Sequence, residues 1–148
     1  MTPQNAKSSV TAQMVLDEAR TWLDTPFHHQ GRLKGVGVDC IGVIIGVAHA
    51  LGISDFNTVD YGRIPNGNML RALLEENMLS VPIWDSRPGD IGLFTFEREP
   101  QHVAIFTDTG LLHSYQQVKK CVEHSFLTPW PQRLVAVFRY QGVQPWLR

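Results

Sequence analysis

One cysteine and two histidines are the residues in this sequence with the clearest capacity for chemistry. Cys40 lies at the expected first turn of an apolar helix, and His102 and His113 lie on two expected neighbouring strands. A helix N-terminus lowers the pKa of a thiol, because backbone dipoles stabilise negative charge there. A thiol peptidase needs such a thiolate, a base beside it and a group that orients the base. We therefore interpret Cys40 as a nucleophile, His102 as its base and His113 as the residue that fixes the tautomer of His102.

Other interpretations of the same residues remain open. Taken singly, a cysteine at a helix start is usually a small buried residue, and a strand histidine is usually structural. Zinc is a further alternative, because the side chains of Cys40, His102, His113 and Cys121 are all of ligand types that suit it. The close ligand pair typical of such sites, Cys-x-x-Cys, is absent from the sequence. We predict neither a metal nor a cofactor.

The elements that must position these residues change in character along the chain. Apolar residues recur at helical spacing in two segments, about residues 10–23 and 68–78, and a third expected helix, about 40–51, is apolar nearly all round and should be buried. Five short β-rich runs follow, separated by turns that contain Pro, Gly and Asp: 91–96, 102–107, 111–115, 119–125 and 134–140. Helices first and strands afterwards predict an α+β fold with an antiparallel sheet.

The loop before Cys40 supplies further candidate residues. Residues 27–38 contain three glycines and are expected to form a loop, which begins where Pro26 ends the first helix. Asp39 is expected to cap the helix that starts at Cys40. Free N–H groups at that helix N-terminus could donate to an oxyanion, and His28 and His29 could line the substrate groove. Ordinary loop residues are the alternative for both histidines.

Length and charge limit the classes of protein to which the chain can belong. Its 148 residues suit one domain, with residues 1–8 as a flexible tail and residues 9–148 as the domain. A net charge of -1 gives no electrostatic reason to expect a nucleic-acid or membrane-surface partner. The apolar stretch 41–51 is too short to span a bilayer, and residues 1–9 lack the apolar core of a secretory signal. We expect a chain made in the cytoplasm, with Cys40 and Cys121 as free thiols.

Four short motifs, in order along the chain, resemble those of the NlpC-type cell-wall peptidases. They correspond to the nucleophile region, a turn with its following strand, the strand of the base and the strand of the third polar residue. In this sequence they read Pro26-Phe27 with Gly31 and Asp39-Cys40-Ile41-Gly42, then Pro88-Gly89-Asp90-Ile91-Gly92-Leu93-Phe94, His102-Val103-Ala104-Ile105 and Leu112-His113-Ser114. The resemblance covers roughly residues 12–140.

The resemblance implies a papain-like fold, with the cysteine helix packed on a central antiparallel sheet. It also implies cleavage of amide bonds in peptidoglycan stem peptides, commonly between D-γ-glutamate and a diamino acid. Two residues depart from the family pattern. Phe27 stands where the family usually has Tyr, which puts oxyanion stabilisation or substrate positioning in question. Ile41 replaces the small residue that commonly follows the cysteine, a change expected to affect packing only.

A more specific resemblance is to the branch of this family encoded with bacteriophage tail genes. It rests on His29-Gln30-Gly31-Arg32, on Thr128-Pro129-Trp130 and on Ala136-Val137-Phe138-Arg139-Tyr140. This implies a phage or prophage tail-associated peptidase that is built into a tail, contacts other tail proteins and acts at the cell wall. The alternative is a structural tail component that keeps the peptidase fold with weak or lost activity. Phe27 favours that alternative, and the intact Cys40, His102 and His113 oppose it.

Overall fold

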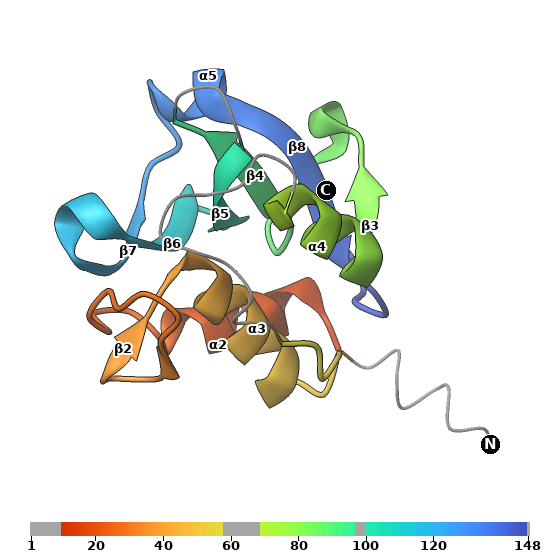
Figure 1. Cartoon of the computed structure of the whole chain (residues 1–148). Coiled ribbons are helices and arrows are strands. Elements are labelled where there is room, and N and C mark those ends of the chain that lie inside the picture. The colour runs from red at the N-terminus through yellow and green to blue at the C-terminus, as the bar shows by residue number, and fades with distance from the viewer. Residues whose placement is uncertain (1–9, 58–68, 97–99, 148) are drawn as a thin grey trace.

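The computed structural model describes residues 10–57, 69–96 and 100–147, in which helices pack on an antiparallel sheet (Figure 1). The helices are α2 (Ala12–Arg20), α3 (Cys40–Ala50), α4 (Met69–Asn77) and the short α5 (Trp130–Arg133). The main sheet has the strand order β3-β8-β4-β5-β6-β7. Its strands are β3 (Met78–Val81), β4 (Ile91–Thr95), β5 (Pro100–Phe106), β6 (Leu111–Tyr115), β7 (Lys120–His124) and β8 (Leu134–Tyr140). The predicted α+β fold is confirmed.

The sequence did not predict every element. The expected loop 27–38 contains a small hairpin of β1 (Arg32–Leu33) and β2 (Gly37–Val38). The amphipathic stretch 68–78 forms α4 and then runs directly into β3, an edge strand paired with β8. Only Met78 and Val81 of β3 are buried, so the strand lacks the alternating pattern that would have marked it. The flexible tail predicted for residues 1–8 lies outside the described residues.

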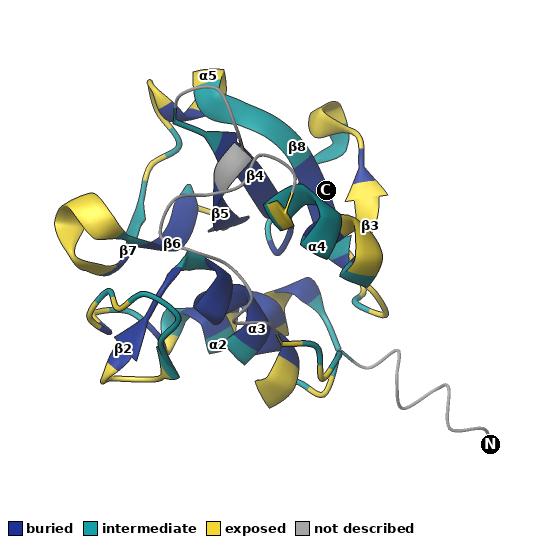
Figure 2. Cartoon of the chain, in the orientation of Figure 1, coloured by how far each residue is buried: buried dark blue, intermediate teal, exposed yellow. Residues whose placement is uncertain are grey.

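Helix α3 lies against the centre of the molecule and is buried on most of its surface (Figure 2). The larger apolar core lies between this helix, α2, α4 and one face of the sheet. Two side-chain hydrogen bonds attach the helix region to the sheet. The Tyr140 hydroxyl donates to the Ile44 carbonyl at 2.6 Å, and the Ser114 hydroxyl donates to the Val38 carbonyl at 2.7 Å. The start of α3 is therefore held at a fixed place on the sheet.

Strands β5 and β6 separate from each other near the place where α3 begins. The ladder between β5 and β6 pairs only Ile105 with Leu112 and Phe106 with Leu111, whereas β6 and β7 share five pairs. Residues 102–104 and 113–115 of the two strands therefore extend beyond their common ladder. Val38, directly before Asp39 and Cys40, approaches here through its bond to Ser114. This gap brings the N-terminus of α3 next to the strands that carry His102 and His113.

The turn before β4 does more than reverse the chain. Asp90, 2% exposed, accepts a hydrogen bond from the Arg87 backbone N–H at 2.9 Å. Its two carboxylate oxygens also receive the Arg139 guanidinium, at 2.7 and 2.8 Å. The sequence assigned Asp90 to the turn alone, but the structure adds a bidentate ion pair that ties the start of β4 to β8. No helix in the described ranges is both long enough and apolar enough to cross a bilayer.

Candidate active site

The first turn of α3 is organised by the carboxylate of Asp39. As predicted, Asp39 caps the helix, and its Oδ1 accepts from the Gly42 N–H at 2.8 Å. The same carboxylate accepts from the Gln30 N–H at 2.8 Å and lies 3.2 Å from Nη1 of Arg32. Asp39 is only 3% exposed, so these bonds fasten the preceding loop to the start of the helix. Its role in the structure is to hold Cys40 in place.

Gly42 explains why this loop can pack so closely on the helix. A Cβ atom at this position would lie 2.5 Å from the Gly31 carbonyl oxygen and 2.6 Å from Cγ2 of Val38. The first contact is with backbone, which cannot swing aside, so the close approach requires glycine. Ile41, by contrast, is 2% exposed and belongs to the main core, which agrees with the packing role expected for it.

The thiol of Cys40 is uncharged in this structure. Burial of the sulfur and the neighbouring Asp39 carboxylate raise the pKa of Cys40 to about 12. The backbone N–H groups of Val103, Ile41 and Cys40 itself act in the opposite direction, but more weakly. The sequence prediction of a lowered pKa is therefore wrong for the resting structure. A helix N-terminus favours the thiolate, but here burial and an adjacent carboxylate outweigh it.

Three histidines form a continuous row of ring contacts across β5, β6 and β7. Nε2 of His102 lies 2.5 Å from Nδ1 of His113, and Nε2 of His113 lies 2.7 Å from Nε2 of His124. At the far end, Nδ1 of His124 lies 2.9 Å from the carbonyl oxygen of Ser125. The contact expected between His102 and His113 is present. The sequence did not predict the role of His124, which extends the row by one residue.

A signal for His124 does exist in the sequence. The three histidines are equally spaced, eleven residues apart, on consecutive antiparallel strands. The register pairs His113 with Val122 and Leu111 with His124, so the two histidines are diagonal neighbours on one face of the sheet. Spacing alone does not fix register, because the turn lengths must also be known.

The histidine row is enclosed by aromatic side chains. Trp130 packs edge-on against His113 with ring centroids 5.0 Å apart, and Tyr115 stacks on the same ring at 5.2 Å. Burial and the neighbouring rings lower the pKa of His102 to about 3 and that of His113 to about 2. Both imidazoles are therefore neutral at pH 7, the form in which a histidine can act as a base.

Cys40 contacts β5 directly beside His102. The Val103 N–H, one residue after His102, is one of the groups directed at the Cys40 sulfur. Within the described residues, however, the sulfur and the His102 ring do not form a hydrogen bond. The predicted nucleophile and the predicted base therefore lie near each other without a direct hydrogen bond.

The other predicted residues are distributed around this centre. Phe27 is half-buried and forms a backbone bridge to Val38, two residues before the cysteine. His28 is exposed and its ring contacts the carbonyl of His29 at 3.0 Å. Cys121 is a buried residue of the larger core. Among the residues that the structure describes, no three side chains of His, Cys, Asp or Glu are placed to hold a metal ion.

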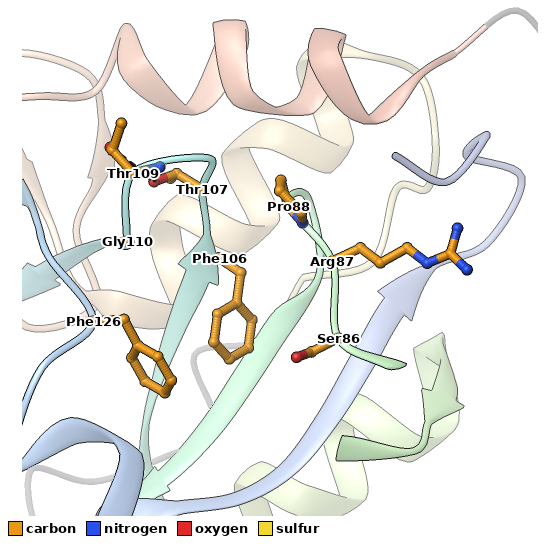
Figure 3. Close-up of a pocket in the computed structure, with 8 residues that line it drawn as sticks. All are labelled: Ser86, Arg87, Pro88, Phe106, Thr107, Thr109, Gly110 and Phe126. Atoms are coloured by element: carbon orange, nitrogen blue, oxygen red, sulfur yellow. Dashed lines mark hydrogen bonds between the residues drawn. The ribbon is translucent and has the colours of Figure 1, made fainter. Parts of the chain in front are cut away.

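A pocket of about 280 Å³ lies elsewhere, around the turn between β5 and β6 (Figure 3). Its lining includes Phe106, Thr107 and Gly110, whereas His102 is near the other end of β5, roughly 13 Å away along the strand. The Arg87 side chain points away from the pocket (Figure 3), where it donates to the Trp146 carbonyl at 3.0 Å. The pocket is separate from the histidine row.

Comparison with known proteins gives a consistent picture of the fold. No family model and no curated protein matches the chain by sequence. Three solved structures that resemble it are NlpC1 from Trichomonas vaginalis (TM-score 0.65, 16% identity), the NlpC/p60 domain of peptidoglycan hydrolase SagA (0.62, 17%) and a lipoprotein-like NLP/P60 family protein from Staphylococcus aureus (0.60, 21%).

The match covers 87% of this chain in each case. It spans 98% of the SagA domain, but only 44% of the Trichomonas protein and 41% of the Staphylococcus protein. At these identities the likeness establishes the architecture. The chain has the papain-like α+β fold of NlpC/P60 domains, with the predicted nucleophile at the start of the helix that packs on the sheet.

Proposed function

We propose that the chain is a cysteine peptidase that hydrolyses amide bonds in the stem peptides of peptidoglycan. The observation that carries this proposal is the histidine pair His102–His113, located where the helix that begins at Cys40 meets the sheet. Its setting in an NlpC/P60 fold supports a cell-wall substrate, because one of the similar structures is described as a peptidoglycan hydrolase. Fold alone would not suffice, since one fold can host several functions.

The residues suggest a course for the reaction. The free ring nitrogen of His102 takes the proton of the Cys40 thiol, and the sulfur attacks the carbonyl carbon of the scissile amide. N–H groups at the first turn of α3 stabilise the oxyanion that forms. The protonated His102 then gives its proton to the leaving amine, which leaves a thioester on Cys40. Water, activated by the same imidazole, hydrolyses the thioester and restores the thiol.

The test is digestion of purified peptidoglycan, with mass analysis of the released fragments. Wild type should release peptides, whereas Cys40→Ala and His102→Ala should each remove nearly all hydrolysis. The double variant should be little worse than either single one, because a nucleophile and its base fail as a unit. Cys121→Ala and His49→Ala serve as matched controls. The Cys121 side chain is part of the core, and the His49 ring contacts the carbonyl oxygen of Phe56. If the two control variants lost activity while Cys40→Ala and His102→Ala kept it, the assignment of Cys40 and His102 would be wrong.

Two finer proposals rest on the sequence resemblance. The bond cleaved is the one between D-γ-glutamate and the diamino acid, and the mass of the released fragments identifies it directly. The protein acts as part of a phage or prophage tail, together with other tail proteins. Antibody labelling of purified tail particles tests this, and particles without the chain would refute it.

A structural tail component with weak or lost activity is the second candidate function. The raised pKa of Cys40 and the unformed Cys40–His102 hydrogen bond favour it. A tail particle that contains the chain, together with a folded wild type that does not digest muropeptides, would decide for this alternative.

A further inference from the structure

The row of histidines ends at a group that can act in only one way. Nδ1 of His124 lies 2.9 Å from the carbonyl oxygen of Ser125, and a carbonyl oxygen can accept but never donate a hydrogen bond. Nδ1 of His124 must therefore carry a proton. In the form of the ring that carries one proton, the other nitrogen, Nε2, has a lone pair, and this nitrogen faces Nε2 of His113 at 2.7 Å.

The same reasoning passes from ring to ring. His113 must donate from Nε2 to His124, which leaves Nδ1 of His113 as an acceptor. That nitrogen lies 2.5 Å from Nε2 of His102, so His102 in turn donates from Nε2. The lone pair of His102 is then on Nδ1, the nitrogen that the row does not use. A base needs this lone pair in order to take a proton.

We propose that His124 is a positioning residue, through which the Ser125 carbonyl fixes the tautomer of His113 and His102 and keeps Nδ1 of His102 available as the base. This inference rests on the proposed peptidase function and extends its machinery to β7. A purely structural role for His124 is the competing explanation, because its ring also packs 5.7 Å from that of Trp130. The two explanations differ in what happens when the ring is kept and its acceptor is removed.

Two substitutions separate these roles. His124→Phe keeps a flat ring beside Trp130 but offers no acceptor to His113. The buried His113 then has no partner for its Nε2–H, so the tautomer that supports catalysis is disfavoured, and kcat should fall roughly tenfold to a hundredfold with KM little changed. His124→Gln can accept the same proton through its side-chain carbonyl and should recover most of that loss.

The tautomers are observed directly by NMR of protein labelled with ¹⁵N-histidine, at about pH 8, where ordinary histidines are uncharged. In wild type, Nδ1 of His102 should show the shift of an unprotonated nitrogen and Nε2 that of a protonated one. His124→Phe should convert His102 wholly or partly to the opposite tautomer, whereas His124→Gln should resemble wild type. His49→Phe, a matched change outside the row, should leave the His102 signals unchanged.

The spectrum does not depend on turnover, so the two proposals can fail separately. A wild type in which Nδ1 of His102 is protonated would overturn this inference even if the protein digests peptidoglycan. So would a folded His124→Phe variant with wild-type nitrogen shifts and wild-type kcat. The predicted tautomers in a folded protein without peptidase activity would instead refute the proposed function and leave the tautomer assignment standing.

Discussion

The two buried neutral histidines make a specific prediction for stability as the pH falls. Burial lowers the pKa of His102 to about 3 and that of His113 to about 2, whereas both titrate near 6.5 in an unfolded chain. Between pH 3 and pH 6.5 the unfolded chain therefore binds protons that the folded protein does not. By linkage, the free energy of unfolding must rise with pH through this interval and fall as the solution is acidified.

The magnitude follows from the difference in bound protons. Each histidine that is charged only in the unfolded chain contributes about 1.4 kcal/mol per pH unit well below pH 6.5. Integrated from pH 7 to pH 5, this amounts to about 2 kcal/mol for one such histidine and about 4 kcal/mol for both. The hydrogen bond from Arg20 lowers the pKa of Glu123 to about 2, so ionised Glu123 also stabilises the folded protein. That contribution is lost mainly below pH 4.5, outside the interval from pH 7 to pH 5.

Urea unfolding at pH 7 and pH 5, in wild type and in His113→Phe, measures this directly. Wild type should lose about 4 kcal/mol of unfolding free energy over the interval and the variant only about 2 kcal/mol, whatever its stability at pH 7. His49→Phe makes the same replacement at an exposed histidine outside the row and serves as the matched control. Equal pH dependence in wild type and His113→Phe would show that His113 is not buried in its neutral form.

Two further predictions concern the nucleophile region. In the folded protein, iodoacetamide should alkylate Cys40 faster than Cys121. Burial raises the pKa of both thiols to about 12, but Cys40 is partly exposed whereas Cys121 is 0% exposed. Equal labelling rates by mass spectrometry would contradict this. Phe27→Tyr should raise kcat/KM on muropeptides, by up to about 10²–10³ if the new hydroxyl donates to the oxyanion, with little change in Tm; a folded variant without a gain would show that this position does not serve the oxyanion.

Local patterns were sufficient to predict the main elements of this fold. The apolar run that forms α3, the cap at Asp39 and the β-rich runs of β4 to β8 each depend on neighbours in sequence. What could not be predicted depends on distant partners. The edge strand β3 exists because β8 pairs with it, and the Asp90–Arg139 ion pair joins residues 49 positions apart.

The candidate site shows the same division. Residue types and order identified Cys40, His102 and His113, and the hairpin between β5 and β6 predicted the contact of the two histidines. The charge state of the thiol could not be predicted, because the burial that raises its pKa is a property of the packed structure. His124 could not be assigned either, since its contact with His113 depends on the register of β7 against β6.

A row of histidines suits this place in the molecule better than a carboxylate would. His113 is 1% exposed and packs against Trp130 and Tyr115, and a charged group among such rings would lose its hydration with little in return. A neutral imidazole offers one donor and one acceptor and carries no net charge. A row of them can therefore transmit the direction of a hydrogen bond through an apolar layer, from the Ser125 carbonyl to the proposed base. Orientation of the proposed base then depends on an unbroken row, so His124, on the edge strand β7, is as necessary to the geometry as His113 in the middle of the row.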